Sequence, residues 1–210
     1  MQIQKRIKDI IRLLEIDYPE AKCSLDYMKD YELLFATRLA AQCTDARVNM
    51  ITPVFFTAYP TLQAIADANV ADVEKYIHSS GFYHAKARDI VAAAKMLISD
   101  FGGHVPDTME DLLKLPGVGR KTANLILGDV FGKSAVVVDT HCIRLCNRIG
   151  LVSTEDPVKI ETALRALLPP EKSSDFCHRL VLHGRAVCPA RSPKCKECSI
   201  KDYCDYYKEH

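Results

Sequence analysis

The chain has 210 residues, of which 48% are hydrophobic and 26% are charged, with 9 glycines and 10 prolines. This composition is typical of a folded globular protein and excludes disordered, collagen-like and low-complexity chains. Lys and Arg (28) nearly balance Asp and Glu (27), giving a net charge of +1. A nucleic acid would therefore have to meet a local basic patch, because the overall charge does not attract it.

Targeting and redox signals are also weak. No stretch has the length and apolar character of a membrane span, and charges are threaded through the first eleven residues, where a secretory signal needs an apolar run. We therefore expect a cytoplasmic protein of bacterial or archaeal type that does not bind membranes. The nine cysteines are an odd number without an export signal, which argues against a disulfide framework.

Apolar residues at helical spacing predict helices along nearly the whole chain. The first carries an apolar stripe, and the others are expected at about 29–42, 45–58, 70–78, 84–100, 108–114, 120–131, 140–149, 157–167 and 172–186. Asp45, Thr108 and Asp139 stand where N-caps are expected, and Pro157 where a first helical turn tolerates proline. The one strand candidate, 135–138, is too short to build a sheet. The expected fold is all-α.

The segment Leu115-Pro-Gly-Val-Gly-Arg-Lys-Thr-Ala123 joins two of these helices. Gly117 and Gly119 let the backbone turn tightly and expose its amides, and the next helix begins at about Arg120. The amides and the positive end of that helix make an anion site suited to a DNA phosphate. The alternative is a plain tight turn.

Lys121 lies in the first turn of that helix, where a cation is electrostatically disfavoured. This position favours the neutral amine, a nucleophile able to form a Schiff base. The alternative is a surface lysine that contacts a phosphate. Asp139 follows the apolar run 135–138, and its alternative role is a helix N-cap. A cap leaves one carboxylate oxygen free to stabilise a cationic sugar transition state.

Four cysteines lie close together near the C-terminus in the pattern Cys188-x6-Cys195-x2-Cys198-x5-Cys204. Four thiolates suit zinc or an iron–sulfur cluster. Zinc sites more often use two CxxC pairs, and the wide spacings here suit a cubane. The overlapping segment 178–201 is basic, because Glu197 is its one acidic residue against six cations, Arg179, Arg185, Arg191, Lys194, Lys196 and Lys201. This patch would bind DNA; the alternative is a solvated face.

The order and spacing of these motifs resemble the endonuclease III family, the helix–hairpin–helix class of DNA-repair glycosylases. The similarity covers essentially the whole chain and includes Gln42-Cys-Thr-Asp45, Gly81-Phe-Tyr83 and Leu182-His-Gly-Arg185. It implies a six-helix domain (23–133) with the hairpin, and a second helical domain (1–22 and 134–210) with a [4Fe–4S] cluster. A DNA-binding cleft would lie between them.

The resemblance also implies residue roles. Lys121 matches the nucleophilic lysine and Asp139 the catalytic aspartate, and Cys188, Cys195, Cys198 and Cys204 match the cluster ligands. Gln42 matches the residue that fills the gap left by the extruded base. Phe82 matches the wedge that enters the opposite strand, where family members often carry leucine.

The activity implied is that of a bifunctional DNA glycosylase and AP lyase. It would act as a monomer on double-stranded DNA, removing oxidised pyrimidines and nicking 3′ to the abasic site by β-elimination. One alternative is a related glycosylase of different base specificity; the adenine-removing branch generally lacks the lysine found here at Lys121. The other is a non-catalytic DNA-binding module with a structural metal site, against which the joint presence of Lys121 and Asp139 speaks.

Overall fold

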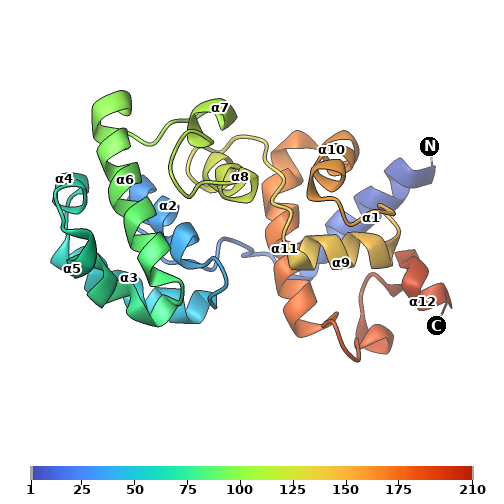
Figure 1. Ribbon diagram of the computed structural model, residues 1–210. Helices are drawn as coiled ribbons and strands as arrows, with labels where there is room; N and C mark the ends of the chain where they lie inside the picture. The colour runs from blue at the N-terminus through green and yellow to red at the C-terminus, as the bar shows by residue number, and fades with distance from the viewer. Residues whose placement is uncertain (1, 210) are drawn as a thin grey trace. The chain divides into compact units, whose positions relative to one another are not determined.

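The computed structural model describes residues 2–209 and, within them, contains helices and no strands (Figure 1). The all-α expectation is confirmed. No helix in this range has the length and apolar character needed to cross a bilayer. The chain divides into two compact units, one formed by residues 23–131 and the other by residues up to Lys22 together with those from Gly132 onward.

The unit 23–131 contains seven α-helices and one 3-10 helix. These are α2 (Asp30–Leu39), α3 (Asp45–Ala58), α4 (Leu62–Ala66), α5 (Val70–Ile77), η1 (His78–Ser80), α6 (Tyr83–Phe101), α7 (Met109–Leu112) and α8 (Arg120–Asp129). The long α6 packs against α4 and α5 and also contacts α2 (Figure 1). Its buried face carries alanine and branched aliphatic side chains, which allow close helix packing.

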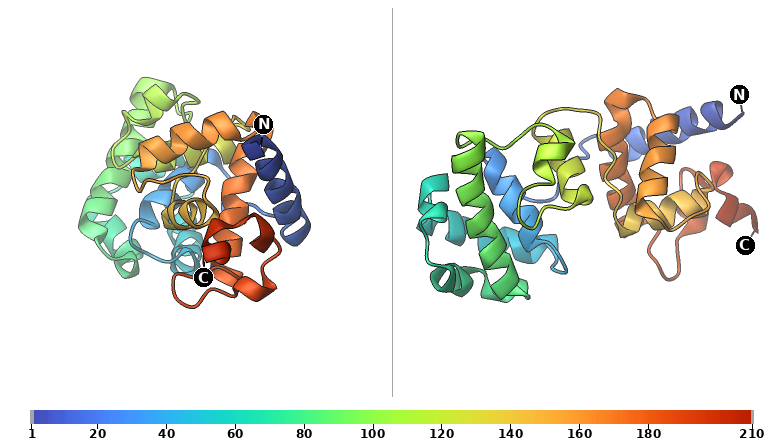
Figure 2. Two further views of the ribbon diagram at one scale, coloured as in Figure 1. Left: turned by 90° about the vertical axis from the view of Figure 1, so that its right-hand side faces the viewer. Right: turned by 45° about the horizontal axis from the view of Figure 1, so that its top comes forward.

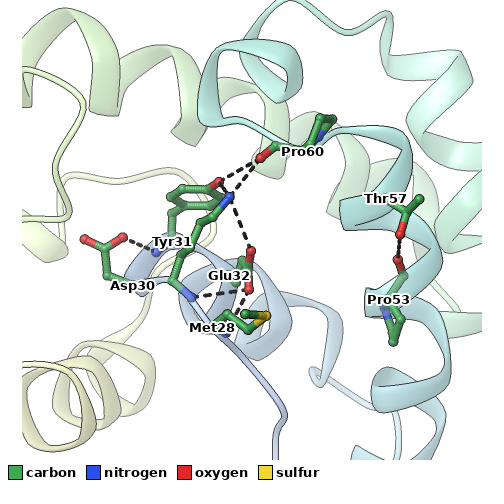
Figure 3. A network of polar contacts seen from close by, with 8 residues as sticks. Met28, Asp30, Tyr31, Glu32, Pro53, Thr57 and Pro60 are labelled. Atoms are coloured by element: carbon green, nitrogen blue, oxygen red, sulfur yellow. Dashed lines mark hydrogen bonds and ion pairs between the residues drawn. The ribbon is translucent and has the colours of Figure 1, made fainter.

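The beginning of α2 is fixed by polar contacts (Figure 3). The Glu32 carboxylate accepts the backbone N–H groups of Met28 (2.9 Å) and Lys29 (3.3 Å), so it satisfies donors that a helix start leaves without intrahelical partners. The Lys29 ammonium donates to the carbonyl of Pro60 at 2.9 Å. These contacts fix the helix whose other end leads into the Gln42 turn.

The second unit combines α1 (Gln2–Asp17) with helices from the C-terminal third of the chain. These are α9 (Thr140–Ile149), α10 (Pro157–Leu167), η2 (Pro170–Lys172), α11 (Ser173–Ala186), η3 (Cys195–Glu197), η4 (Lys201–Tyr203) and α12 (Asp205–Glu209). Helix α1 packs beside α11, and α12 beside α9 (Figure 2). The apolar stripe predicted on α1 is buried at Ile7, Ile10, Ile11 and Leu14.

Helix caps follow the sequence with one correction. Thr108 caps α7 and Asp139 caps α9, as expected, and Pro157 is the first residue of α10. The prediction that Asp45 caps α3 is wrong, because the side chain of Thr44 accepts the N–H of Arg47. Asp45 is the first helical residue, where its charge still favours the helix dipole.

The segment 135–138 is buried and belongs to no helix or strand among the described residues. It lies in the second unit and leads directly to Asp139. Its burial holds the backbone that delivers this carboxylate to the start of α9.

Candidate active site and cysteine pocket

The hairpin between α7 and α8 turns at Gly117, whose φ is +75°. A Cβ on this residue would lie 2.7 Å from Nε of Arg38 and 2.8 Å from Oδ2 of Asp89. Those two side chains form an ion pair between α2 and α6 with a shortest distance of 2.7 Å. The hairpin therefore rests directly on this pair, and both the backbone conformation and the close approach require glycine here.

Gly119 plays a different part from the one its sequence suggests. Its φ of −102° and ψ of 176° are open to any residue, and a Cβ would meet nothing within 4 Å. It is the N-cap of α8, and a glycine there has no side chain to cover the helix start. The first amides of a helix have no intrahelical partner, so this start is accessible to an anion.

Lys121 is the second residue of α8 and is exposed, as is Arg120. The opposite face of α8 is buried, which fixes the helix on the unit's core. Burial raises the pKa of the nearby Cys23 thiol to about 12, although the Lys121 charge acts in the other direction. Cys23 therefore stays protonated near neutral pH and is a poor nucleophile beside this amine.

Asp139 is half-buried at the N-terminus of α9. Its Oδ1 accepts the N–H of Cys142 at 2.7 Å. The cap orients the carboxylate and leaves Oδ2 outside this bond. Lys121 belongs to the unit 23–131 and Asp139 to the other unit.

Gln42 and Phe82 share an unusual backbone conformation. Both have positive φ, at +54° and +49°, and Ser192 is the only other non-glycine residue of this kind within residues 2–209. For L-residues this conformation costs roughly 1–2 kcal/mol, and such strain is concentrated at functional sites. Both side chains are exposed, and Phe82 has 68% of its surface in solvent.

The four C-terminal cysteines line one pocket together with Arg148, Pro193 and Lys201. Helix η3 and helix η4 place Cys195, Cys198 and Cys204 around it, and Cys188 follows the end of α11. Within the described part of the chain, no three His, Cys, Asp or Glu side chains converge closely enough to hold a single metal ion. The donor set, four thiols on a shared pocket, is nevertheless the one that iron–sulfur clusters use.

Sequence reasoning missed the polar side chains that contact these thiols. The Arg148 guanidinium donates to Sγ of Cys188 at 3.1 Å and to the carbonyl of Pro189 at 2.8 Å. Nε2 of His183 lies 3.4 Å from Sγ of Cys198, and Nδ1 of His183 lies 3.2 Å from the hydroxyl of Tyr18. These contacts join helices distant in sequence, so no local pattern announces them.

Protonation states near the pocket follow from burial. Burial lowers the pKa of His183, so the ring is neutral near pH 7. Burial raises the pKa of the Cys198 thiol to about 11 and also raises that of Cys204. Because metals bind thiolates, cluster assembly has to displace these protons.

The basic patch is smaller than the sequence predicts. Arg191 and Lys194 are exposed in the cysteine loop, as expected. Arg179 is only 6% exposed, and its Nε donates to the carbonyl of Tyr18 at 3.1 Å. Its inclusion in the patch is wrong, since it lies on the buried face of α11.

Gly184 of α11 lies against His141 and Arg144 of α9 where the two helices pack together. A Cβ on Gly184 would lie 2.5 Å from Nδ1 of His141 and 3.0 Å from Nη2 of Arg144. Arg144 also donates to the carbonyls of Gly184 (3.3 Å) and Cys188 (3.1 Å). The close contact that this glycine permits therefore links the helix capped by Asp139 to the beginning of the cysteine loop.

Three other cysteines, scattered in the sequence, form a buried group. Sγ of Cys142 lies 3.9 Å from Sγ of Cys146, and Cys177 hydrogen-bonds Cys142. The bond to Cys146 and burial raise the pKa of Cys142 well above its ordinary value, and the bond to Cys142 and burial do the same for the pKa of Cys177. The group is a packed, protonated part of the α9–α11 core.

Comparison with known proteins places this geometry in a family. Residues 35–170 match the HhH-GPD superfamily base excision DNA repair proteins. An endonuclease III of Synechocystis sp. is 46% identical over 96% of this chain and 92% of its own length. The endonuclease III of Escherichia coli is 38% identical over 98% of this chain and 97% of its own length.

Solved structures agree with the sequence relatives. A non-covalent complex of endonuclease III with DNA matches with a TM-score of 0.92 and 37% identity, over 98% of this chain and 97% of that one. A trapped covalent endonuclease III–DNA intermediate matches equally well. A thermostable thymine-DNA glycosylase matches with a TM-score of 0.87 and 26% identity, covering 98% of each chain. The chain therefore belongs to the HhH-GPD superfamily of base excision DNA repair proteins and, within it, to the endonuclease III family.

Proposed function

We propose that Lys121 and Asp139 carry out the chemistry of this endonuclease III family member on oxidised pyrimidines in duplex DNA. The family activity is that of a base excision repair DNA glycosylase with AP lyase activity. The observation that supports the assignment best is the placement of Lys121, exposed in the first turn of a helix whose N-cap is a bare glycine.

DNA is held through backbone groups and exposed cations. The start of α8 receives a phosphate at Gly117, Gly119 and Arg120, because helix N-terminal amides bind anions. Arg191 and Lys194 contact further phosphates. The damaged base leaves the stack at a cost of a few kcal/mol, which is smaller for a poorly stacked lesion. Gln42 then fills the gap, and Phe82 enters the opposite strand.

The reaction proceeds through a Schiff base. Nζ of Lys121 bonds to C1′ of the deoxyribose as the glycosidic bond breaks and the base departs with its electron pair. Asp139 stabilises positive charge on the sugar and assists proton transfer. The C1′–O4′ bond then breaks and O4′ takes up a proton, which leaves an imine between Nζ and C1′. The imine acidifies the C2′ proton, and loss of that proton drives cleavage of the C3′–O bond, which breaks the strand on the 3′ side.

The pocket of Cys188, Cys195, Cys198 and Cys204 is suited to a [4Fe–4S] cluster. Four thiols line it, and the Arg148 guanidinium, a hydrogen-bond donor, already lies against the sulfur of Cys188. When bound there, the cluster would be held by these four cysteines through iron–thiolate bonds and would tie the loop together. The cluster would take no part in bond breaking. The colour of the purified protein distinguishes a cluster from zinc, because only the cluster gives a yellow-brown protein.

Borohydride trapping tests the nucleophile. Reduction of the imine should leave the protein covalently joined to DNA that contains an oxidised pyrimidine, and Lys121→Gln should abolish the adduct. Lys75→Gln is the matched control, because Lys75 is exposed on α5 with 74% of its side chain in solvent. Normal trapping by Lys121→Gln would show that another group attacks the sugar. No trapping by the unmodified protein, loaded with iron, would refute the lyase function.

A further inference from the structure

Lys86 is a lysine that the proposed chemistry does not use, and it is completely buried near the beginning of α6. Its Nζ donates to the carbonyl of Leu39 at 2.7 Å and to the carbonyl of Ser80 at 2.9 Å. Removing an ammonium from water is expensive unless it is well hydrogen-bonded. The two carbonyls therefore account for its position.

Both acceptors are at the ends of helices. Leu39 is the last residue of α2, and Ser80 is the last residue of η1. Terminal carbonyls of helices lack intrahelical partners, and the C-terminal end of a helix favours a cation. The single ammonium of Lys86 thus hydrogen-bonds two helix ends that are 41 residues apart in sequence.

Each of these helix ends leads directly into a strained turn. Gln42 follows Leu39 by three residues and has a φ of +54°; Phe82 follows Ser80 by two residues and has a φ of +49°. The side chains of Gln42 and Phe82 are both exposed to solvent. The amine of Lys86 therefore fixes the separation of the two turns that carry the exposed Gln42 and Phe82.

We propose that Lys86 is a positioning residue that holds the Gln42 and Phe82 turns in register, so that both side chains enter the duplex together. The inference rests on the proposed function, because it takes Gln42 and Phe82 to be the inserting residues. Lys86 touches neither DNA nor the reacting atoms, and it acts through the two carbonyls. A purely structural lysine would stabilise the unit without setting the activity of these two turns.

The test is a mutant cycle on release of an oxidised pyrimidine from duplex DNA under single-turnover conditions. Lys86→Met keeps the length of the side chain and removes its N–H donors. It should slow base release about 10-fold or more, because small misplacements of positioning groups have large effects on rate. In a Gln42→Ala, Phe82→Ala background the same substitution should change the rate by less than about twofold, as expected for residues that act as one unit.

A fluorescent base analogue opposite the lesion gives a second readout. Its unstacking signal on protein binding should fall in Lys86→Met and stay normal in Lys95→Met, the matched control, since Lys95 is exposed on the same helix. An equal slowing of base release by Lys86→Met in both backgrounds, or no slowing at all, would overturn the inference.

Trapping by borohydride on a preformed abasic site separates this inference from the proposed function. If the unmodified protein forms the adduct and Lys86→Met behaves like the unmodified protein in base release, only the positioning role fails. If the unmodified protein forms no adduct, the proposed function itself fails. Should Lys86→Met not fold, Lys86→Leu, which likewise has no side-chain N–H donor, replaces it in the same cycle with the same criteria.

Discussion

The carboxylate of Asp139 serves two purposes that a single residue can combine. Its Oδ1 accepts the N–H of Cys142 at 2.7 Å and caps α9, while Oδ2 stays outside that bond. The cap restricts the side chain to one orientation, and an oriented carboxylate stabilises a developing cation better than a mobile one. The two purposes can be separated by substitution.

Asp139→Asn should keep the cap and lose the chemistry. Asparagine caps helices about as well as aspartate, so the free energy of unfolding, measured by thermal denaturation, should change by less than about 0.5 kcal/mol. Base release should fall by roughly 100-fold or more, the scale expected for loss of a charged catalytic group, while affinity for damaged DNA is retained. Asp139→Ala should lose about 1 kcal/mol of stability as well. Unchanged turnover in Asp139→Asn would reduce Asp139 to a cap.

The two hairpin glycines should respond differently to alanine. Gly117→Ala places a Cβ against the Arg38–Asp89 pair at positive φ, so we expect a destabilisation of about 1–3 kcal/mol by chemical denaturation. Gly119→Ala meets open space, so its cost should be limited to about 0.5 kcal/mol from the poorer N-cap. It should weaken DNA binding, because the methyl group stands at the start of α8. Equal stability losses would contradict this reading.

Helices α9 and α11 illustrate what a local pattern can and cannot predict. Their positions follow from apolar periodicity, and the Asp139 cap is readable from its place before the helix. Their contact is not, because it depends on Gly184 admitting His141 and Arg144 from 40 or more residues away. Likewise α4 and α12, at five residues each, are too short for periodicity to reveal.

A substitution at Gly184 tests the importance of this helix contact. Gly184→Ala puts a methyl group 2.5 Å from Nδ1 of His141, so the His141 and Arg144 side chains or the helices must shift, at a cost of about 1–3 kcal/mol. The Arg144 bond to Cys188 should weaken with it, which should lower iron retention per protein during dialysis. Ala186→Ser, at an exposed site on the same helix, is the control and should retain iron normally. Normal iron retention in Gly184→Ala would show that the contact does not support the loop.

At the scale of the whole molecule, the motifs predicted where most of the candidate residues lie in the fold, and the roles of these residues stay predictions. Lys121, Gly117 and the four cysteines lie where the sequence pattern indicates, because each is fixed by its own helix end or loop. No local pattern indicates the contacts of Lys86, Arg148 and His183, because their partners are distant carbonyls and thiols that only the folded chain brings near. The prediction that Arg179 is part of the basic patch was wrong for the same reason, because its charge alone does not indicate that it is buried.

If the cysteine pocket holds the proposed cluster, removal of its iron should affect one unit and spare the other. The four cysteines all belong to the unit formed by the chain ends, and their loop is irregular between short 3-10 turns. After chelation, amide hydrogen exchange should accelerate across residues 187–209 and stay slow in the buried helices of 23–131. Uniform acceleration in both units would contradict a local role for the metal.

Helix α1 packs against α11, a helix that begins only at Ser173. At about 5–20 residues per second, a ribosome needs roughly 10 to 30 s to make the intervening chain. Within that interval residues 23–131 are completed, while the apolar stripe of α1 still lacks its partner helix α11. Helix α1 is thus synthesised long before the helix that it packs against, and its place in the fold is completed only late in synthesis.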